Sequence, residues 1–330
     1  MHYSEIIFFG CFIAFIVGIL LVDLLVIDKE AHEVSMKEAG TWTAVWITLA
    51  LAFSAFLWFH GDLVHGIHNM SDLQLVVSRY ADHMKINPND FEGSVQMYRQ
   101  HMTISYITGY LIEKTLSVDN LFVMMMIFTS FGVKKKDYQR VLNWGILGAI
   151  VMRFIFIFLG AAVIRRFDWI LIIFGGFLLY SGVKMFIDRN KDESHVDVEH
   201  HPIVKLLRKY FPFISPLMVT VIFIEFSDLI FAFDSIPAVF SVSLDPYVVF
   251  FSNIFAILGL RAMFFLLAGV ADRFRYLKPG VCVLLVFIGV KLLIHKYVEI
   301  GTIESLIFIL AVLTVSIGLS LVIPEKKKLQ

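Results

Sequence analysis

The chain has little of what organises most soluble or secreted folds. Only two of its 330 residues are cysteines, Cys11 and Cys282, and both lie inside apolar runs. That pattern argues against a disulfide framework and against a cysteine-based metal site. Charge of neither sign is in excess, because 28 lysines and arginines balance 28 aspartates and glutamates. A net charge of zero does not by itself identify a partner. We expect no nucleic-acid ligand.

Apolar side chains, in contrast, are abundant. Hydrophobic residues make up 58% of the sequence, including 33 phenylalanines, whereas a soluble domain is about 45–50% apolar. Stretches long enough for a membrane-spanning helix lie at residues 5–27, 41–60, 103–130, 141–163, 168–187, 214–242, 247–269, 279–298 and 302–323. The sequence therefore predicts an all-α polytopic membrane protein with about nine transmembrane helices.

Basic residues are unevenly divided between the expected loops. Alternate loops collect most of the lysines and arginines, with clusters at 134–140, 184–209, 273–278 and 326–328. Loops rich in Lys and Arg stay on the cytoplasmic side. We therefore expect a multi-pass protein in the lipid bilayer of the cell (inner) membrane, with its amino terminus outside and its carboxyl terminus in the cytoplasm.

The spans and loops predict an order of segments along the chain. These are two transmembrane helices (1–60), an extracytoplasmic loop with amphipathic helices (61–102), a first three-helix repeat (103–188), a cytoplasmic linker (189–213), a second three-helix repeat (214–299), and a last span with a basic tail (300–330). In the external loop, His60, Asp62, His65, His68 and Asp72 could share helical faces. We interpret them as ordinary interfacial polar residues, with a metal-sampling vestibule as the alternative.

One apolar stretch contains charge that a membrane span normally excludes. Glu225, Asp228 and Asp234 lie in the expected span 214–242, and each intramembrane carboxylate costs about 2.5–3.5 kcal/mol on insertion scales. A second acidic segment lies 115 residues earlier. The shift aligns Glu113 with Asp228, Asp119 with Asp234, and Asn120 with Ser235. Such residues mark an ion or proton path inside a helix bundle.

The two acidic segments belong to a longer internal repeat. Each is followed by a span with an arginine, Arg153 or Arg261, and then by a span with a G-V-K signature at Gly182 or Gly289. Each unit holds three spans, an odd number, so the two copies insert in opposite orientations. Inverted repeats are typical of transporters, whose substrate site lies near the midplane at the repeat interface.

The candidate metal ligands are all oxygen donors: Glu113, Asp119, Asn120, Glu225, Asp228, Asp234 and Ser235. Such a set suits Mg²⁺, Ca²⁺ or Mn²⁺, whereas copper or zinc would call for Cys or His in the core. Lys114, Arg153 and Arg261 are candidates for charge compensation. The alternative is that these bases and the acids form only structural ion pairs, but five acids against three bases leave an excess that calls for another cation.

The spacing of the acids suggests how the site works. Each segment places two carboxylates six residues apart, which is about 120° around a straight helix. Either different partners use the two acids of a segment, or the helix breaks between them. Pro237 favours a break in the second copy, because it removes the amide that would bond to Phe233. Buried acids cannot all be ionised without a cation, so the empty site should hold protons that a divalent metal displaces.

At these motifs the sequence resembles the TerC/Alx family of bacterial integral membrane proteins. The resemblance rests on E-K-T-L-S-V-D-N-L-F-V and E-F-S-D-L-I-F-A-F-D-S-I-P-A, and it runs from about Tyr106 to the last span. It implies export of Mn²⁺ as transported substrate, with no prosthetic group, through the motif acids Glu113, Asp119, Glu225, Asp228 and Asp234. The alternatives are a Ca²⁺ or Mg²⁺ transporter of the same design, or a non-transporting membrane component of a tellurite or metal stress response. An enzyme is not expected, because an intramembrane aspartyl protease would need a G-x-G-D signature, which the chain lacks.

Overall fold

The computed structural model describes residues 3–22, 34–82, 84–167, 169–188, 215–270, 276–294, 297–298 and 300–322. Within these ranges every regular element is a helix. The expected linker 189–213 and the basic tail after residue 322 lie outside the described residues. So do the side chains of Asp119 and Asp234, although the backbones of both belong to helices.

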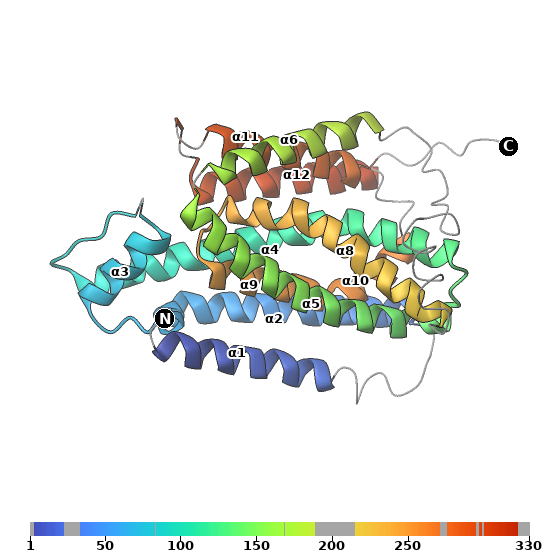
Figure 1. Cartoon of the computed structure of the whole chain (residues 1–330), viewed down its shortest axis with the longest axis horizontal. Helices are drawn as coiled ribbons and strands as arrows, with labels where there is room; N and C mark the ends of the chain where they lie inside the picture. The colour runs from blue at the N-terminus through green and yellow to red at the C-terminus, as the bar shows by residue number, and fades with distance from the viewer. Residues whose placement is uncertain are drawn as a thin grey trace.

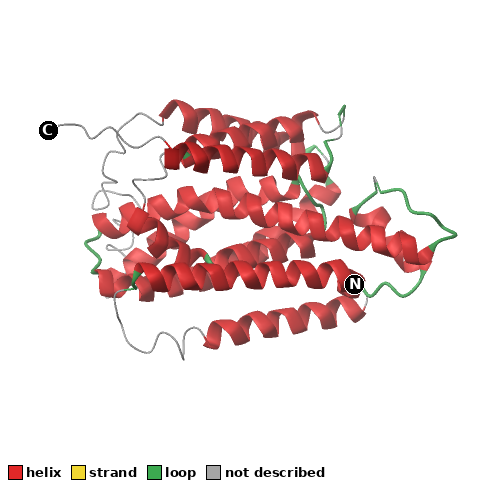
Figure 2. Ribbon diagram, turned by 180° about the vertical axis from the view of Figure 1, so that it is seen from behind, coloured by secondary structure: helices red, strands yellow, loops and turns green. Residues whose placement is uncertain are grey.

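The helices run side by side as a bundle (Figures 1 and 2). They are α1 (Tyr3–Val22), α2 (Met36–His60), η2 (Gly61–Val64), α3 (Met70–Tyr80), α4 (Phe91–Ser130), α5 (Lys135–Arg166), α6 (Ile170–Asp188), α8 (Pro216–Phe240), α9 (Pro246–Leu258), α10 (Leu260–Val270), α11 (Leu277–Ile294) and α12 (Thr302–Val322). Helix α1 lies on one flank, and α6, α11 and α12 lie on the opposite flank. Helix α3 extends beyond the end of the bundle at which α1 begins, here called the amino-terminal end.

Short polar residues set where several helices begin. Ser35 and Glu38 form a capping box at the start of α2, in which the Glu38 amide donates to Ser35 Oγ at 3.2 Å. Helix α9 starts with Asp245, whose side chain accepts from the Tyr247 amide at 2.9 Å, followed by Pro246. Proline is well placed there because the first amide of a helix has no partner to lose.

Long apolar helices make up most of the bundle. Within the described residues, five helices are long and apolar enough to cross a membrane, and a sixth span results if α9 and α10 are counted together. Each stretch expected to span is mainly helical where the structure describes it, including α4 with 40 residues and α8 with 25. The full set of nine crossings stays a prediction.

The expected break in the acidic helices is wrong. Helices α4 and α8 are continuous through their acidic motifs. Pro237 lies in the last turn of α8, where the Ser241 amide still donates to the Pro237 carbonyl, so the missing amide costs one bond close to the helix end. The chain breaks instead at Gly259, where α9 and α10 meet with a bend of 45°.

Glycines bring α6 and α11 into close contact. A Cβ atom on Gly175 would lie 2.9 Å from the carbonyl oxygen of Gly289, and one on Gly182 would lie 3.0 Å from that of Cys282. Larger residues at these positions would push the two backbones apart. The G-V-K glycines of the repeat, Gly182 and Gly289, therefore both lie in the interface between α6 and α11.

Candidate ion site

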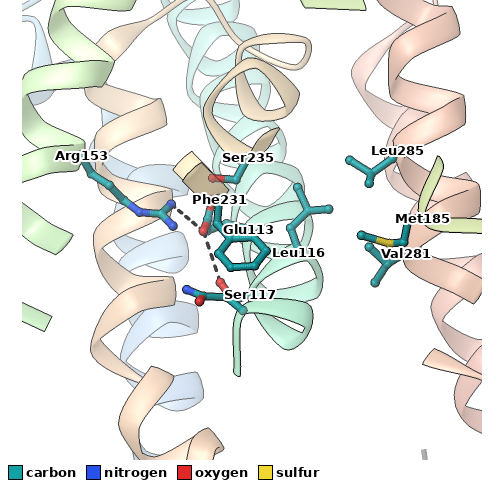
Figure 3. Close-up of a pocket in the computed structure, with 10 residues that line it drawn as sticks. Glu113, Leu116, Ser117, Arg153, Met185, Phe231, Ser235, Val281 and Leu285 are labelled. Carbon is teal, nitrogen blue, oxygen red and sulfur yellow. Dashed lines mark hydrogen bonds and ion pairs between the residues drawn. The ribbon is translucent and has the colours of Figure 1, made fainter. Parts of the chain in front are cut away.

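A pocket lies in the middle of the bundle between the acidic helices and the α6–α11 pair (Figure 3). Its lining combines charged and hydroxyl side chains on one side with apolar side chains and a thioether on the other: Glu113, Leu116, Ser117, Asn120, Arg153, Met185, Phe231, Ser235, Val281 and Leu285. Figure 3 shows Met185, Val281 and Leu285 facing the acidic helices across this space. The pocket is thus formed where helices of both expected repeat units meet.

Glu113 is the central charge of the pocket. It is completely buried, and its Oε1 atom lies 2.5 Å from a guanidinium nitrogen of Arg153 and accepts a hydrogen bond from Ser117 at 3.2 Å. Arg153 also donates to the side-chain oxygen of Asn253 on α9. The remaining oxygen, Oε2, is buried and has no hydrogen-bond partner among the described residues. Within the described part of the chain, Glu113 therefore keeps one oxygen available as a ligand atom.

Asp228 reaches the same region from α8. Its carboxylate accepts a hydrogen bond from the side-chain amide of Asn120 on α4, and the charges of Arg153 and Glu113 act on it. Besides Glu113 Oε2, two more oxygens at the pocket are buried without a partner among the described residues, Asn120 Oδ1 and Ser235 Oγ. Buried polar atoms normally have partners, so three such oxygens at one pocket indicate space for a cation or for water.

The structure does not bring all of the predicted ligands together. Glu225 is half-buried and lies against α5, where a Cβ on Gly148 would come within about 2.0 Å of its carboxylate. No group of three or more Asp, Glu, His or Cys side chains in the described ranges is close enough to hold a metal ion. The contribution of Asp119 and Asp234 stays a prediction, because their side chains lie outside the described part.

The other two predicted basic residues, Lys114 and Arg261, each make a contact between the two expected repeat units. The Lys114 ammonium donates to the carbonyl of Ala256 at 3.1 Å, next to the break at Gly259. Arg261 on α10 donates to Asn143 on α5 at 2.7 Å. The Arg153–Asn253 and Arg261–Asn143 contacts therefore cross between α5 and the α9–α10 pair in both directions.

The family of the chain can now be stated from comparison with known proteins. A model of the integral membrane protein TerC family matches residues 98–328. The chain belongs to the TerC family. With its long apolar helices it is a multi-pass integral membrane protein. The match contains every residue that lines the pocket.

Relatives of this TerC-family chain extend the similarity to almost its whole length. An uncharacterized membrane protein of Myxococcus xanthus is 40% identical over 329 residues, covering 94% of this chain and 91% of that protein. An Escherichia coli (strain K12) protein named "Putative membrane-bound redox modulator Alx" is 41% identical over 326 residues, covering 93% of this chain and 92% of that protein. No solved structure matches the chain.

Sequence patterns did not single out several residues at or near this pocket. Asn143 and Asn253 hold the two arginines, and Met185 adds the one thioether among the residues lining the pocket. Neutral side chains in apolar helices give little signal. The available clue to the two asparagines was their spacing in the sequence, because Asn143 precedes Arg153 by nearly as many residues as Asn253 precedes Arg261.

A second polar cluster lies at the amino-terminal end of the bundle. His65, completely buried, is 2.9 Å from Glu5 of α1 through Nδ1 and 2.8 Å from Asp245 through Nε2. The rings of Tyr80 and Tyr247 flank the imidazole, each with a centroid distance of 5.2 Å. His65 was expected to be an interfacial polar residue, but its two carboxylate contacts make it a buried link between α1, the segment that follows α2, and the start of α9.

Proposed function

We propose that this TerC-family protein is a transporter that exports a divalent metal ion, Mn²⁺ in particular, in exchange for protons. The observation that carries the proposal is a set of three oxygens, Glu113 Oε2, Asn120 Oδ1 and Ser235 Oγ, that have no hydrogen-bond partner among the described residues and lie at a buried pocket between two acidic helices. Carboxylate, amide and hydroxyl oxygens suit Mn²⁺, Mg²⁺ and Ca²⁺. Asp119 and Asp234, one on each acidic helix, complete the proposed ligand set.

Reciprocal contacts support the proposed inverted repeat. When a two-fold axis relates two units, each contact between them occurs twice. If position i of the first unit contacts position j of the second, then position j of the first contacts position i of the second. The repeat pairs Gly175 with Cys282 and Gly182 with Gly289, and the observed approaches are Gly175 to Gly289 and Gly182 to Cys282. Exchanging the units converts one approach into the other.

The site residues follow the same rule. The two arginine–asparagine hydrogen bonds, Arg153–Asn253 and Arg261–Asn143, exchange into each other. The repeat pairs Asn120 with Ser235 and Asp228 with Glu113. The pair that corresponds to the Asn120–Asp228 hydrogen bond is therefore Ser235 and Glu113, and both of these residues line one pocket. Alternating access between two such units around a fixed midplane site is the general design of inverted-repeat transporters.

The proposed direction of metal transport follows from the orientation of the chain in the membrane and from the proton gradient. Loop charges put the amino-terminal end outside, so export carries the metal towards the end where α3 lies. Protons that neutralise the acids when the metal leaves would return to the inside, which couples export to the proton gradient.

A Ca²⁺ or Mg²⁺ transporter is the main alternative because all three ions prefer oxygen ligands. A non-transporting membrane component is the other, and in it the acids would have only structural partners such as Arg153.

The test is metal content of cells challenged with Mn²⁺, measured by mass spectrometry. Wild-type protein should lower cell Mn²⁺, and Glu113→Gln, Asp119→Asn, Asp228→Asn and Asp234→Asn should each reduce that effect by about tenfold or more, provided that each variant reaches the membrane. The matched control is Glu92→Gln, an exposed carboxylate in the first turn of α4, which should behave as wild type. Equal Mn²⁺ lowering by all variants would refute the site, whereas a change only in Ca²⁺ or Mg²⁺ would correct the ion.

A further inference from the structure

A stripe of mostly polar residues, here called the polar stripe, runs along one face of α4. It consists of Tyr98, Ser105, Gly109, Glu113 and Asn120, whose spacing places them within about 80° of one another around the helix. Helix α4 begins near α3 and runs along the bundle (Figure 1), so the stripe extends from the amino-terminal end to the pocket. The distance along the helix axis from Tyr98 to Glu113 is about 22 Å.

Buried oxygens without a partner are concentrated on the polar stripe. Six buried side-chain oxygens have no hydrogen-bond partner among the described residues. Four of these six lie on the stripe: Tyr98 OH, Ser105 Oγ, Glu113 Oε2 and Asn120 Oδ1. Buried polar groups without a protein partner are normally hydrogen-bonded to buried water. The stripe therefore offers positions for water on the way to the pocket as well as at the pocket itself.

Ser105 differs from the threonines of the same helix. Three of them donate to the carbonyl four residues earlier at 2.6–2.8 Å: Thr103, Thr108 and Thr115. That bond is the usual one for a hydroxyl inside a helix. The hydroxyl of Ser105 is buried and has no partner in the described part of the chain, its own helix included. It therefore calls for a ligand beside the helix, and water is the simplest that fits a single hydroxyl.

At Gly109, helix α9 supplies the hydroxyl that α4 lacks. A Cβ on Gly109 would lie 2.8 Å from Ser252 Oγ, and Ser252 is completely buried. Ser252 immediately precedes Asn253, and Asn253 accepts from Arg153 at the pocket. Hydroxyls from α4 and α9 thus continue the polar stripe as far as the pocket.

The other end of the polar stripe meets the cluster around His65. Tyr98 is buried, and the charges of Asp245 and Glu5 act on its hydroxyl. His65 bridges those two carboxylates, and an imidazole can bind and release a proton. The charged and titratable groups at this cluster come from five elements: Glu5 of α1, Asp62 of η2, Arg79 and Tyr80 of α3, Tyr98 of α4, and Asp245 and Tyr247 of α9.

We propose that the polar stripe is a path for protons, in which buried water and the hydroxyls of Tyr98, Ser105 and Ser252 connect the His65 cluster to the pocket. The inference rests on the proposed function, in which protons replace the departing metal ion. In the proposed orientation the His65 cluster lies at the outer end of the bundle. Protons then enter from the side to which the metal leaves.

Hydroxyls suit such a path because they can pass a proton on without keeping a charge. A hydroxyl or a water molecule both donates and accepts hydrogen bonds. It can therefore accept a proton on one side while it gives up its own proton on the other side. Each transfer leaves the group neutral, which avoids the cost of a lasting charge in the apolar core.

The experiment measures proton flux and metal binding in the same variants. Full-length protein is purified, Mn²⁺ affinity is measured by calorimetry, and an Mn²⁺ gradient drives proton flux across vesicles that contain a pH-sensitive dye. Tyr98→Phe and Ser105→Ala should each slow this proton flux by roughly three- to tenfold, because each loses one hydroxyl that holds water. Mn²⁺ affinity should stay within about twofold of wild type, because neither residue lines the pocket.

The matched control is Thr103→Val. It removes a buried hydroxyl from α4 between Tyr98 and Ser105, but that hydroxyl lies off the stripe and is already bonded to the Arg99 carbonyl at 2.8 Å. The proton flux of this variant should match wild type within about twofold. Equal slowing by all three substitutions would refute the path, since the loss of any hydroxyl from this part of α4 would then have the same effect.

The proposed function and this inference fail in different ways. Wild-type protein in which Mn²⁺ drives no proton flux would overturn the proposed exchange, and the path with it. Wild-type exchange that Tyr98→Phe and Ser105→Ala leave unchanged would overturn only the path. Slower flux together with weaker Mn²⁺ binding would also overturn the path, because the two residues would then act on the structure of the pocket. Either variant decides the question if the other does not fold.

Discussion

Alkaline pH should weaken the link that His65 forms at the amino-terminal end. Burial lowers the pKa of His65, but the charge and hydrogen bond of Asp245 and the contact with Glu5 outweigh that effect and raise the pKa from 6.5 to about 9. The folded protein therefore binds a proton that the unfolded chain releases at lower pH. The resulting stabilisation is complete below pH 6.5 and is lost as the pH rises through about 9. The difference between the two pKa values corresponds to about 3 kcal/mol.

Thermal unfolding of the purified full chain between about pH 6 and pH 10 measures this effect. His65→Gln keeps a side chain that hydrogen-bonds but has no titratable group. We expect the wild-type midpoint to fall across this range by roughly 5 °C more than that of His65→Gln. His60→Gln, which removes an exposed imidazole at the end of α2, should follow wild type. Parallel curves for wild type and His65→Gln would refute a protonated His65 that bridges Glu5 and Asp245.

Two further predictions concern close approaches at glycines. Gly66→Ala should lower the unfolding midpoint, because Gly66 has a φ of 62° and a Cβ there would lie 1.9 Å from Ser4 Oγ; an unchanged midpoint would show that this turn rearranges freely. Gly109→Ala should destabilise the protein by about 1–3 kcal/mol, since its Cβ would lie 2.8 Å from Ser252 Oγ. Gly176→Ala is the matched control in the same assay, with nothing within 4 Å of the added atom, and it should be neutral or slightly stabilising.

The position of the helix break shows where sequence reasoning stops. Pro237 has an evident local effect, the loss of one amide, but its place in the last turn of α8 limits that effect. Gly259 gives no such signal within its apolar run. Its environment is tertiary: the Lys114 ammonium would lie 2.7 Å from a Cβ at Gly259, and Trp46 packs on the other side. Lys114 and Trp46 come from helices far away in sequence, so the break could not be predicted locally.

Charge in apolar segments was the most informative part of the sequence. The repeat spacing selected Glu113, Asn120 and Ser235, and the structure gathers these three at one pocket. It also selected Arg153, which contacts Glu113. It could not select the partners of His65, because Glu5 and Asp245 are 60 and 180 residues away along the chain. Glu225 had the same sequence signal as Asp228 but lies outside the pocket, because it faces Gly148 of α5.

Helix α9 is held at several points along its length. Asp245 ties its start to His65, Asn253 accepts from Arg153 in its middle, and Ala256 accepts from Lys114 near its end. Every residue of α9 is buried, whereas α10 beyond the break includes exposed positions. The bend at Gly259 therefore joins a fully buried helix, fixed at its start, middle and end, to a helix that is partly exposed.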